Sequence, residues 1–295
     1  MESNRKILKI GLIVITALVV ISYVGVYLLF LDEPIVMEHY IEEQVYFGHL
    51  DGPRPVHLEL NYITNATDHR VVIRVDFPEY PDLEVYASEF GMHGGFPMFI
   101  NGQQQTPGSI KARYNLRTVY LEFHFDDDDL DAESVAITEA LIQFSDGSVV
   151  ENEIGSINFH FAEERSEVVE SKSISGFDHR TVTEFTVNED VELIGIESEF
   201  LPLIQENLEL KVNNRDIGEI EGMKIGARKI ISVVSNIRSP EVQDKNLRTL
   251  KLRPKLRFLR ENGEEETTAL TVGGHRGQEY DFLEILQYLH QRGDL

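Results

Sequence analysis

An uncharged apolar run near the N-terminus constrains this chain more than any other feature. Residues 10–31 read IGLIVITALVVISYVGVYLLFL, 22 residues without a charged side chain. At about 1.5 Å per residue, a helix of this length spans the roughly 30 Å hydrocarbon layer of a bilayer. The run exceeds the usual apolar core of a cleaved signal peptide, the alternative interpretation, and no small-x-small site follows it. It predicts an uncleaved transmembrane signal-anchor helix over residues 10–31.

The charges that flank the run predict its orientation. Before it stand three basic residues and one acidic residue, and after it come Asp32 and Glu33. Because basic residues favour the cytoplasmic side, residues 1–9 are predicted to be a cytoplasmic stub and everything after residue 31 to lie outside the cell membrane. A stub of nine residues is too short to fold by itself, so a signal that crosses the membrane would need a partner protein.

Composition excludes several functions. The chain has 51 acidic against 27 basic residues, a formal net charge of −24, and such a surface repels nucleic acid. It has no cysteine, which rules out disulfides, thiolate metal sites and cysteine nucleophiles. Hydrophobic residues make up 42% of the chain, enough for a packed core.

Two similar segments indicate a duplicated domain. Residues 68–90 and 178–200 both begin with Asp-His-Arg and end with Ser-Glu-Phe, and 9 of the 23 aligned pairs are identical. Looser matches continue downstream, including Asp146-Gly147 with Asn262-Gly263. The repeat predicts a first domain over residues 35–167 and a second over residues 168–295, the latter including a C-terminal helix.

Alternating apolar and polar residues predict strands over residues 71–75, 83–86, 118–125 and 208–212. The Asp-Gly and Asn-Gly dipeptides favour two-residue hairpin turns between strands. Short strands with frequent turns predict a mainly β fold, an N-terminal transmembrane helix followed by two tandem immunoglobulin-like β-sandwich domains. In residues 278–291, apolar side chains recur at helical spacing. We expect this helix to pack on the second domain, the alternatives being a partner-binding or membrane-surface helix.

An acidic loop in the first domain is a candidate Ca²⁺ site. Residues 31–170 contain 28 acidic and seven basic residues, a net charge of −21, and residues 126–133 read DDDDLDAE. Clustered carboxylates suit Ca²⁺, but an EF-hand would need glycine where Ala132 stands and glutamate where Thr138 stands. A solvated loop is the alternative. The candidate ligands are Asp127, Asp129, Asp131 and Glu133.

The second domain carries a basic strip in residues 250–258, LKLRPKLRF. In a strand, alternate side chains would point to one face, and Pro254 predicts an edge strand or a bulge. The charges would then deter aggregation, bind a polyanion such as an envelope polymer, lipid headgroups or an acidic partner, or face the acidic first domain. The candidate binding residues are Lys251, Arg253, Lys255 and Arg257.

The sequence lacks GxSxG, HExxH and phosphate-binding glycine loops. The repeated Asp-His-Arg is interpreted as structural, since adjacent residues of a strand point to opposite faces. We therefore expect a non-enzymatic binding or accessory module of the cell envelope, without a cofactor unless the acidic loop binds Ca²⁺. The alternative is an accessory subunit or sensor partner of a membrane complex, whose helix could pack closely through small residues such as Gly11 and Gly25.

Overall fold

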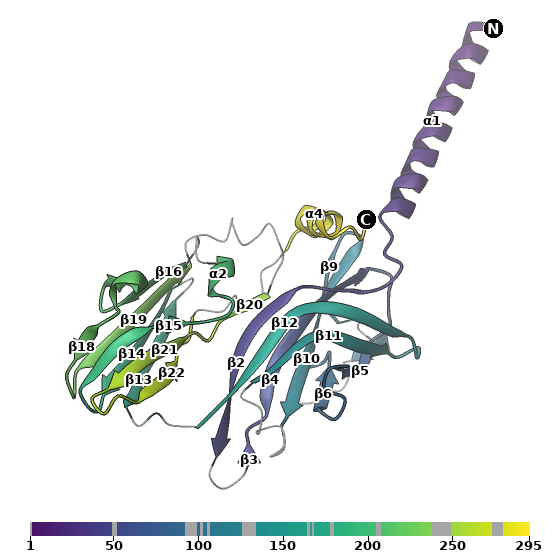
Figure 1. The fold of residues 1–295 in the computed structure, drawn as a ribbon. Helices are drawn as coiled ribbons and strands as arrows, with labels where there is room; N and C mark the ends of the chain where they lie inside the picture. Colours follow the sequence, from purple (N-terminus) through teal and green to yellow (C-terminus); the bar gives the residue numbers. More distant parts are fainter. Residues whose placement is uncertain are drawn as a thin grey trace.

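The strands fold into two β-sandwiches that lie side by side, and a long N-terminal helix projects from the first (Figure 1). The computed structural model describes residues 2–48, 52–91, 99–100, 103–104, 107–125, 134–163, 166, 168–177, 180–204, 208–237, 249–272 and 280–295.

The first sandwich has a five-stranded and a six-stranded sheet. The first contains, in order, β1 (Ile35–Val36), β4 (Val56–Asn65), β10 (Tyr114–His124) and β6 (Glu84–Ser88), with β9 (Ser109–Lys111) beside β10. The second contains β20 (Thr249–Lys251), β2 (His39–Gly48), β12 (Val149–Glu163), β11 (Ser134–Phe144) and β5 (Val72–Asp76), with β3 (Gly52–Pro53) beside β2. A separate ribbon pairs β7 (Phe99–Ile100) with β8 (Gln103–Gln104).

The second sandwich has a five-stranded and a four-stranded sheet. The first contains β13 (Val169–Phe177), β14 (Arg180–Val187), β19 (Ile230–Ile237), β16 (Leu208–Val212) and β17 (Arg215–Asp216). The second contains β18 (Met223–Ile225), β15 (Val191–Glu197), β21 (Lys255–Arg260) and β22 (Glu265–Ala269). Two short helices, α2 (Leu201–Ile204) and η2 (Ile217–Glu219), join its strands.

Both sandwiches share one strand order. In the second, β13-β14-β19-β16 faces β15-β21-β22, the arrangement of a constant-type immunoglobulin sandwich. In the first, β1-β4-β10-β6 and β5-β11-β12 repeat that order, and β2 is added in parallel to β12. The structure thus confirms the mainly β prediction, and the strand order itself is immunoglobulin-like.

The repeated segments nevertheless do not occupy equivalent strands, which corrects the register of the sequence alignment. The first copy contains β5, which pairs with β11 and is the last strand in the order of its sheet, whereas the aligned residues form β14, which lies between β13 and β19. By strand order the equivalent of β5 is β15. Alternation with period two is common to all half-buried strands, so a match of that pattern does not fix which strand is compared.

The two glycine turns are equivalent but differ from the predicted type. In each, only the glycine has a positive φ, 86° at Gly147 and 85° at Gly263. The backbone N–H of each glycine donates to the backbone carbonyl of the residue that ends the preceding strand, which is Phe144 for Gly147 and Arg260 for Gly263. This geometry fits a longer loop, a type I turn followed by a left-handed glycine, in place of the expected two-residue turn.

Each sandwich has its own core. In β10 the alternate residues Val119, Leu121 and Phe123 are fully buried, because one face of the strand points between the sheets. Phe123 packs against Phe159 of β12, with ring centroids 4.9 Å apart. A second cluster, which includes Leu193, Val212 and Phe258, fills the other sandwich. The predicted strands over residues 71–75, 83–86, 118–125 and 208–212 correspond to β5, β6, β10 and β16.

The N-terminal helix α1 spans Glu2–Leu28. Among the helices that the structure describes, none combines the length and apolarity needed to cross a bilayer. The end of α1 is held by the first sandwich: the Asn65 amide donates to the Leu31 carbonyl at 2.6 Å and accepts from the Leu31 N–H at 3.1 Å. The Tyr114 hydroxyl also donates to the carbonyl of Leu29.

The C-terminal helix α4 (Phe282–Arg292) begins with a capping box between Asp281 and Glu284, so it starts four residues after the predicted first residue, Gln278. From its place in the sequence we expected α4 to pack on the second sandwich, but it packs on the first. Its buried residues Ile285 and Leu289 join a cluster with Leu31 and Met37 of the first sandwich. The C-terminus therefore lies beside the C-terminal end of α1 (Figure 1).

Candidate functional site

The two sandwiches meet at a junction, where a strand that lies in the chain between β19 and β21 of the second sandwich is added to a sheet of the first. After leaving the second sandwich the chain forms β20, which pairs in parallel with β2 of the first, and the Thr249 N–H donates to the Glu38 carbonyl at 2.9 Å. An apolar cluster of Phe200, Leu252 and Val272 closes the junction. Tyr40 of β2 packs edge-on against Phe200, with ring centroids 5.6 Å apart.

Glu42 of β2 is the central polar group of this junction. Its side chain is buried, and its Oε1 accepts hydrogen bonds from the Ser198 hydroxyl at 2.7 Å and the Glu199 N–H at 2.8 Å. The Phe200 N–H approaches the same oxygen, and the Arg253 N–H donates to Oε2 at 3.0 Å. A carboxylate has room for about four acceptor sites, so these donors occupy the group and offset the cost of burying it.

The adjacent Glu43 forms ion pairs with two of the four candidate residues of the predicted basic strip. Its carboxylate pairs with the Lys251 ammonium and lies 3.0 Å from an Arg253 guanidinium nitrogen. Glu43 belongs to the first sandwich, whereas the chain that carries Lys251 and Arg253 comes from the second. The structure therefore places these two candidates in contact with the acidic first domain.

The other two basic candidates lie in the second sandwich. Arg257 pairs with Glu265 at 2.6 Å, on the neighbouring strand β22. No ion pair involving Lys255 is recorded among the described residues. The strip is not one edge strand: Pro254 separates β20 from β21, and β21 lies between β15 and β22. Proline has no N–H for a ladder, so the chain changes sheets at this position.

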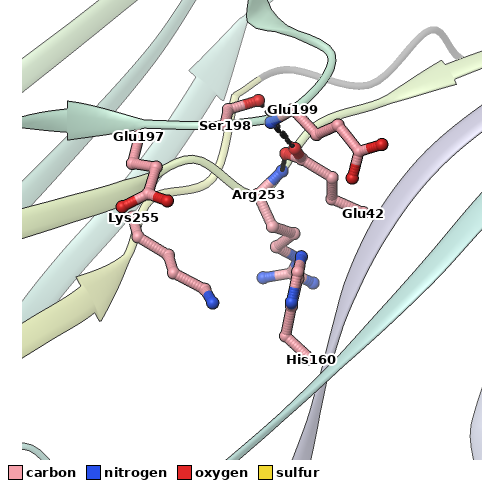
Figure 2. A pocket seen from close by; sticks show the side chains of 7 residues that line it. All are labelled: Glu42, His160, Glu197, Ser198, Glu199, Arg253 and Lys255. Atoms are coloured by element: carbon pink, nitrogen blue, oxygen red, sulfur yellow. Dashed lines mark hydrogen bonds between the residues drawn. The ribbon is translucent and has the colours of Figure 1, made fainter. Parts of the chain in front are cut away.

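A cavity of about 350 Å³ opens at the junction. Figure 2 shows the Lys255 ammonium, the His160 imidazole and the Arg253 guanidinium directed toward one another, with the Glu197 carboxylate beside Lys255. Strands of both sandwiches line it, so it exists only while the two are docked. Its lining residues are Glu42, His160, Glu197, Ser198, Glu199, Arg253 and Lys255.

The surroundings of His160 in the cavity favour its neutral form. Burial lowers the pKa of His160, because it disfavours the imidazolium, and the Lys255 charge lowers this pKa further. Glu42, Glu197 and Glu199 oppose that shift. Of these carboxylates, Glu42 already accepts the hydrogen bonds described above. One oxygen of Glu199 accepts a hydrogen bond from the Asn158 amide at 2.5 Å.

Asp-His-Arg has the structural role predicted for it in the first sandwich. Asp68 pairs with Arg70, which also donates to the Ser148 hydroxyl at 3.0 Å and lies over the Phe144 ring. The Arg70 carbonyl accepts from Arg117, whose guanidinium forms a fully buried pair with Glu89. In the second copy, Asp178 and His179 lie outside the described residues.

The acidic loop, with Asp127, Asp129, Asp131 and Glu133, also lies outside the described residues. Its Ca²⁺ interpretation stays a prediction. Within the described ranges, no group of three or more histidine or acidic residues is arranged to hold a metal ion.

The acidic residues and the histidine of the junction were missed by the sequence reasoning, which identified only its basic residues. Glu42 and Glu43 stand together inside a strand of otherwise mostly apolar residues, a pattern that could have marked carboxylates with partners. His160 and Glu199 carry no comparable signal, because each becomes part of the cavity only when the second sandwich docks on the first.

Comparison with known proteins does not identify a family for this chain. No family model and no curated protein matches the chain. The D00-D0 domain of intimin overlaps 82% of this chain and 98% of its own, with 8% identity and a TM-score of 0.24. The sialic acid binding region of a Streptococcus sanguinis adhesin overlaps 80% of this chain and 75% of its own, with 6% identity and a TM-score of 0.25. The strand order, and not these overlaps, defines the fold class here.

Proposed function

We propose that this protein is a single-pass membrane protein that displays two docked β-sandwiches outside the cell as a non-enzymatic binding or accessory module of the envelope. The observation that carries this proposal is the junction. Glu42, Glu43 and β20 fix one sandwich on the other, which makes a rigid binding surface and not two independent domains on a linker.

The N-terminal segment supports the anchoring part of the proposal. Large apolar side chains of α1 are exposed on every side of the helix: Leu12, Ile13, Val14 and Ile15 are 51–67% exposed, and four consecutive residues cover the full circumference. A helix that is apolar all round is either buried in protein or placed in lipid. We therefore propose that residues 10–28 lie in the membrane, with the sandwiches on the extracytoplasmic side.

The test of this topology is protease protection of the full-length chain. In intact cells, added protease should digest the sandwiches and leave a small membrane-bound fragment; in inverted vesicles the sandwiches should be protected. Extraction with alkaline carbonate should leave the protein in the membrane fraction. Release into the soluble fraction, or protection of the sandwiches in intact cells, would contradict the proposal.

One observation favours the alternative, an accessory subunit or sensor partner of a membrane complex. The end of α1 is not joined to the sandwich by a free linker: Leu31 is buried, and both its N–H and its carbonyl are bonded to Asn65. A movement of the helix would therefore move the first sandwich with it.

Replacing residues 10–28 by an unrelated apolar helix separates the two functions. A display module should keep its function, because any anchor holds the sandwiches at the membrane. An accessory subunit should lose its partner, since helix packing depends on the identity of the facing residues. Because the replacement leaves residues 29–31 unchanged, the contact between Leu31 and Asn65 is kept in the chimaera.

A further inference from the structure

We propose that the cavity at the junction binds a small hydroxylated monocarboxylate, with Lys255 as the ion-pair partner of its carboxylate. The inference rests on the proposed binding function and names the chemical class of the ligand. It follows from which polar groups of the cavity are already occupied and which are not.

Most donors that line the cavity are used by the protein itself. The Ser198 hydroxyl and the Arg253 N–H donate to Glu42, and the Arg253 guanidinium contacts Glu43. Lys255 differs: among the described residues its ammonium has no recorded hydrogen bond or ion pair, although it influences His160. An ammonium group has three donors, so Lys255 can offer them to a ligand in the cavity.

His160 is the second unoccupied group. The structure records no hydrogen-bond partner for its ring within the described part of the chain, and the ring lies in the cavity with Lys255 (Figure 2). A neutral imidazole has one donor and one acceptor nitrogen. A carboxylate placed between the two residues would therefore accept from Lys255 and from the donor nitrogen of His160.

The balance of charge favours a single negative charge on the ligand. Among the described residues that line the cavity, Lys255 is the cation for which no ion pair is recorded, and it can neutralise one negative charge of a ligand. The lining has three carboxylates against the two cations Arg253 and Lys255, so the second charge of a phosphate monoester would add to an existing excess of negative charge. The net charge of −24 on the whole chain matters less, because salt screens charges farther away than about 8 Å.

Size and the remaining acceptors indicate hydroxyl groups. A cavity of about 350 Å³ is at the lower end for small-molecule sites and suits a ligand of monosaccharide size. The Glu197 carboxylate lies at its exposed side, 67% exposed and only 3.8 Å from Arg257. Carboxylates are acceptors only, so hydroxyl hydrogens of the ligand are the natural partners for Glu197 and Glu199.

The experiment is a titration of the full-length protein in detergent micelles with three matched probes: glucuronate, glucose and glucose 6-phosphate. Histidine labelled with ¹³C at Cε1 reports on the site by NMR, and a His160→Gln variant assigns the resonance. Glucuronate should shift the His160 signal, and it should bind more tightly at pH 5.5 than at pH 8. The reason is that a bound anion favours the imidazolium of His160, so protonation and binding strengthen each other.

Two lysine variants make the result specific. Lys255→Gln should weaken glucuronate binding by about tenfold or more, the effect of losing a charge-assisted hydrogen bond. Lys224→Gln, which changes an exposed lysine of β18 in the same sheet, should bind as the unchanged protein does.

Three outcomes would overturn the inference: no glucuronate binding, equal binding of glucose, or tighter binding of glucose 6-phosphate. Equal weakening by the two lysine substitutions would also overturn it, because the effect would then come from overall charge. None of these results bears on the topology and anchor-replacement tests. The ligand class can therefore fail while the proposed function stands, and the reverse also holds.

Discussion

Replacing Glu42 by alanine should separate the two sandwiches without unfolding either. The substitution removes the acceptor for the Ser198 hydroxyl and for the N–H groups of Glu199 and Arg253. Hydrogen bonds to a charged group contribute about 1.5–3 kcal/mol each, but water entering an opened junction would satisfy part of the loss. We expect a net cost of about 3 kcal/mol, roughly a hundredfold shift of the docking equilibrium toward the open form.

Double electron–electron resonance measures this opening directly. The chain has no cysteine, so spin labels can be placed only where cysteines are introduced, at exposed Ala136 in the first sandwich and exposed Ser175 in the second. The unchanged junction should give a narrow distance distribution. Glu42→Ala should add a broad distribution at other distances, while circular dichroism of the β-structure stays the same.

The control is Glu151→Ala, which removes an exposed carboxylate of β12 and should leave the distribution narrow. An unchanged narrow distribution in Glu42→Ala would refute the reasoning. It would mean that β20 and the apolar cluster around Phe200 hold the junction without the carboxylate. Loss of β-structure in Glu42→Ala would equally contradict it, since the residue would then support the first sandwich itself.

Three further predictions concern the first sandwich. Glu89→Ala should lower its unfolding free energy by about 3–5 kcal/mol in urea titrations, because the buried Arg117 loses its partner; a cost below 1 kcal/mol would contradict a tightly paired site. Leu289→Ala in α4 should cost about 2–5 kcal/mol, and hydrogen exchange should rise around Met37 and not in the second-sandwich core, as packing on the first sandwich requires. Burial lowers the pKa of His39 from 6.5 to about 4, so the unfolded chain takes up a proton first. Stability should therefore fall by up to about 3 kcal/mol as the pH drops from 6.5 to 4, and His39→Gln should flatten that part of the profile.

Local patterns in the sequence determined the elements of the fold. Period-two alternation placed the strands over residues 118–125 and 208–212, because a strand with one buried face must alternate. The apolar spacing over residues 278–291 placed the C-terminal helix. The uncharged run over residues 10–31 predicted the position of a membrane anchor.

Which elements meet was decided only by the tertiary structure. The repeat at residues 68–90 and 178–200 aligns strands at different positions of the two sandwiches, because alternation does not encode strand order. The helix α4 packs beside Leu31 and not on the second sandwich, which precedes it in the chain. The reason is that an apolar helix face can be buried against any complementary surface within reach.

The same distinction holds for the site. The sequence alone identified a basic strip with an interruption at Pro254, and it included contact with the acidic first domain among the possible roles. Only the docked sandwiches place Lys251 and Arg253 against Glu43 and direct Lys255 into the cavity with His160. Such pairings join residues more than 90 positions apart, and their partners are chosen by the geometry of the junction, which no local pattern of residues records.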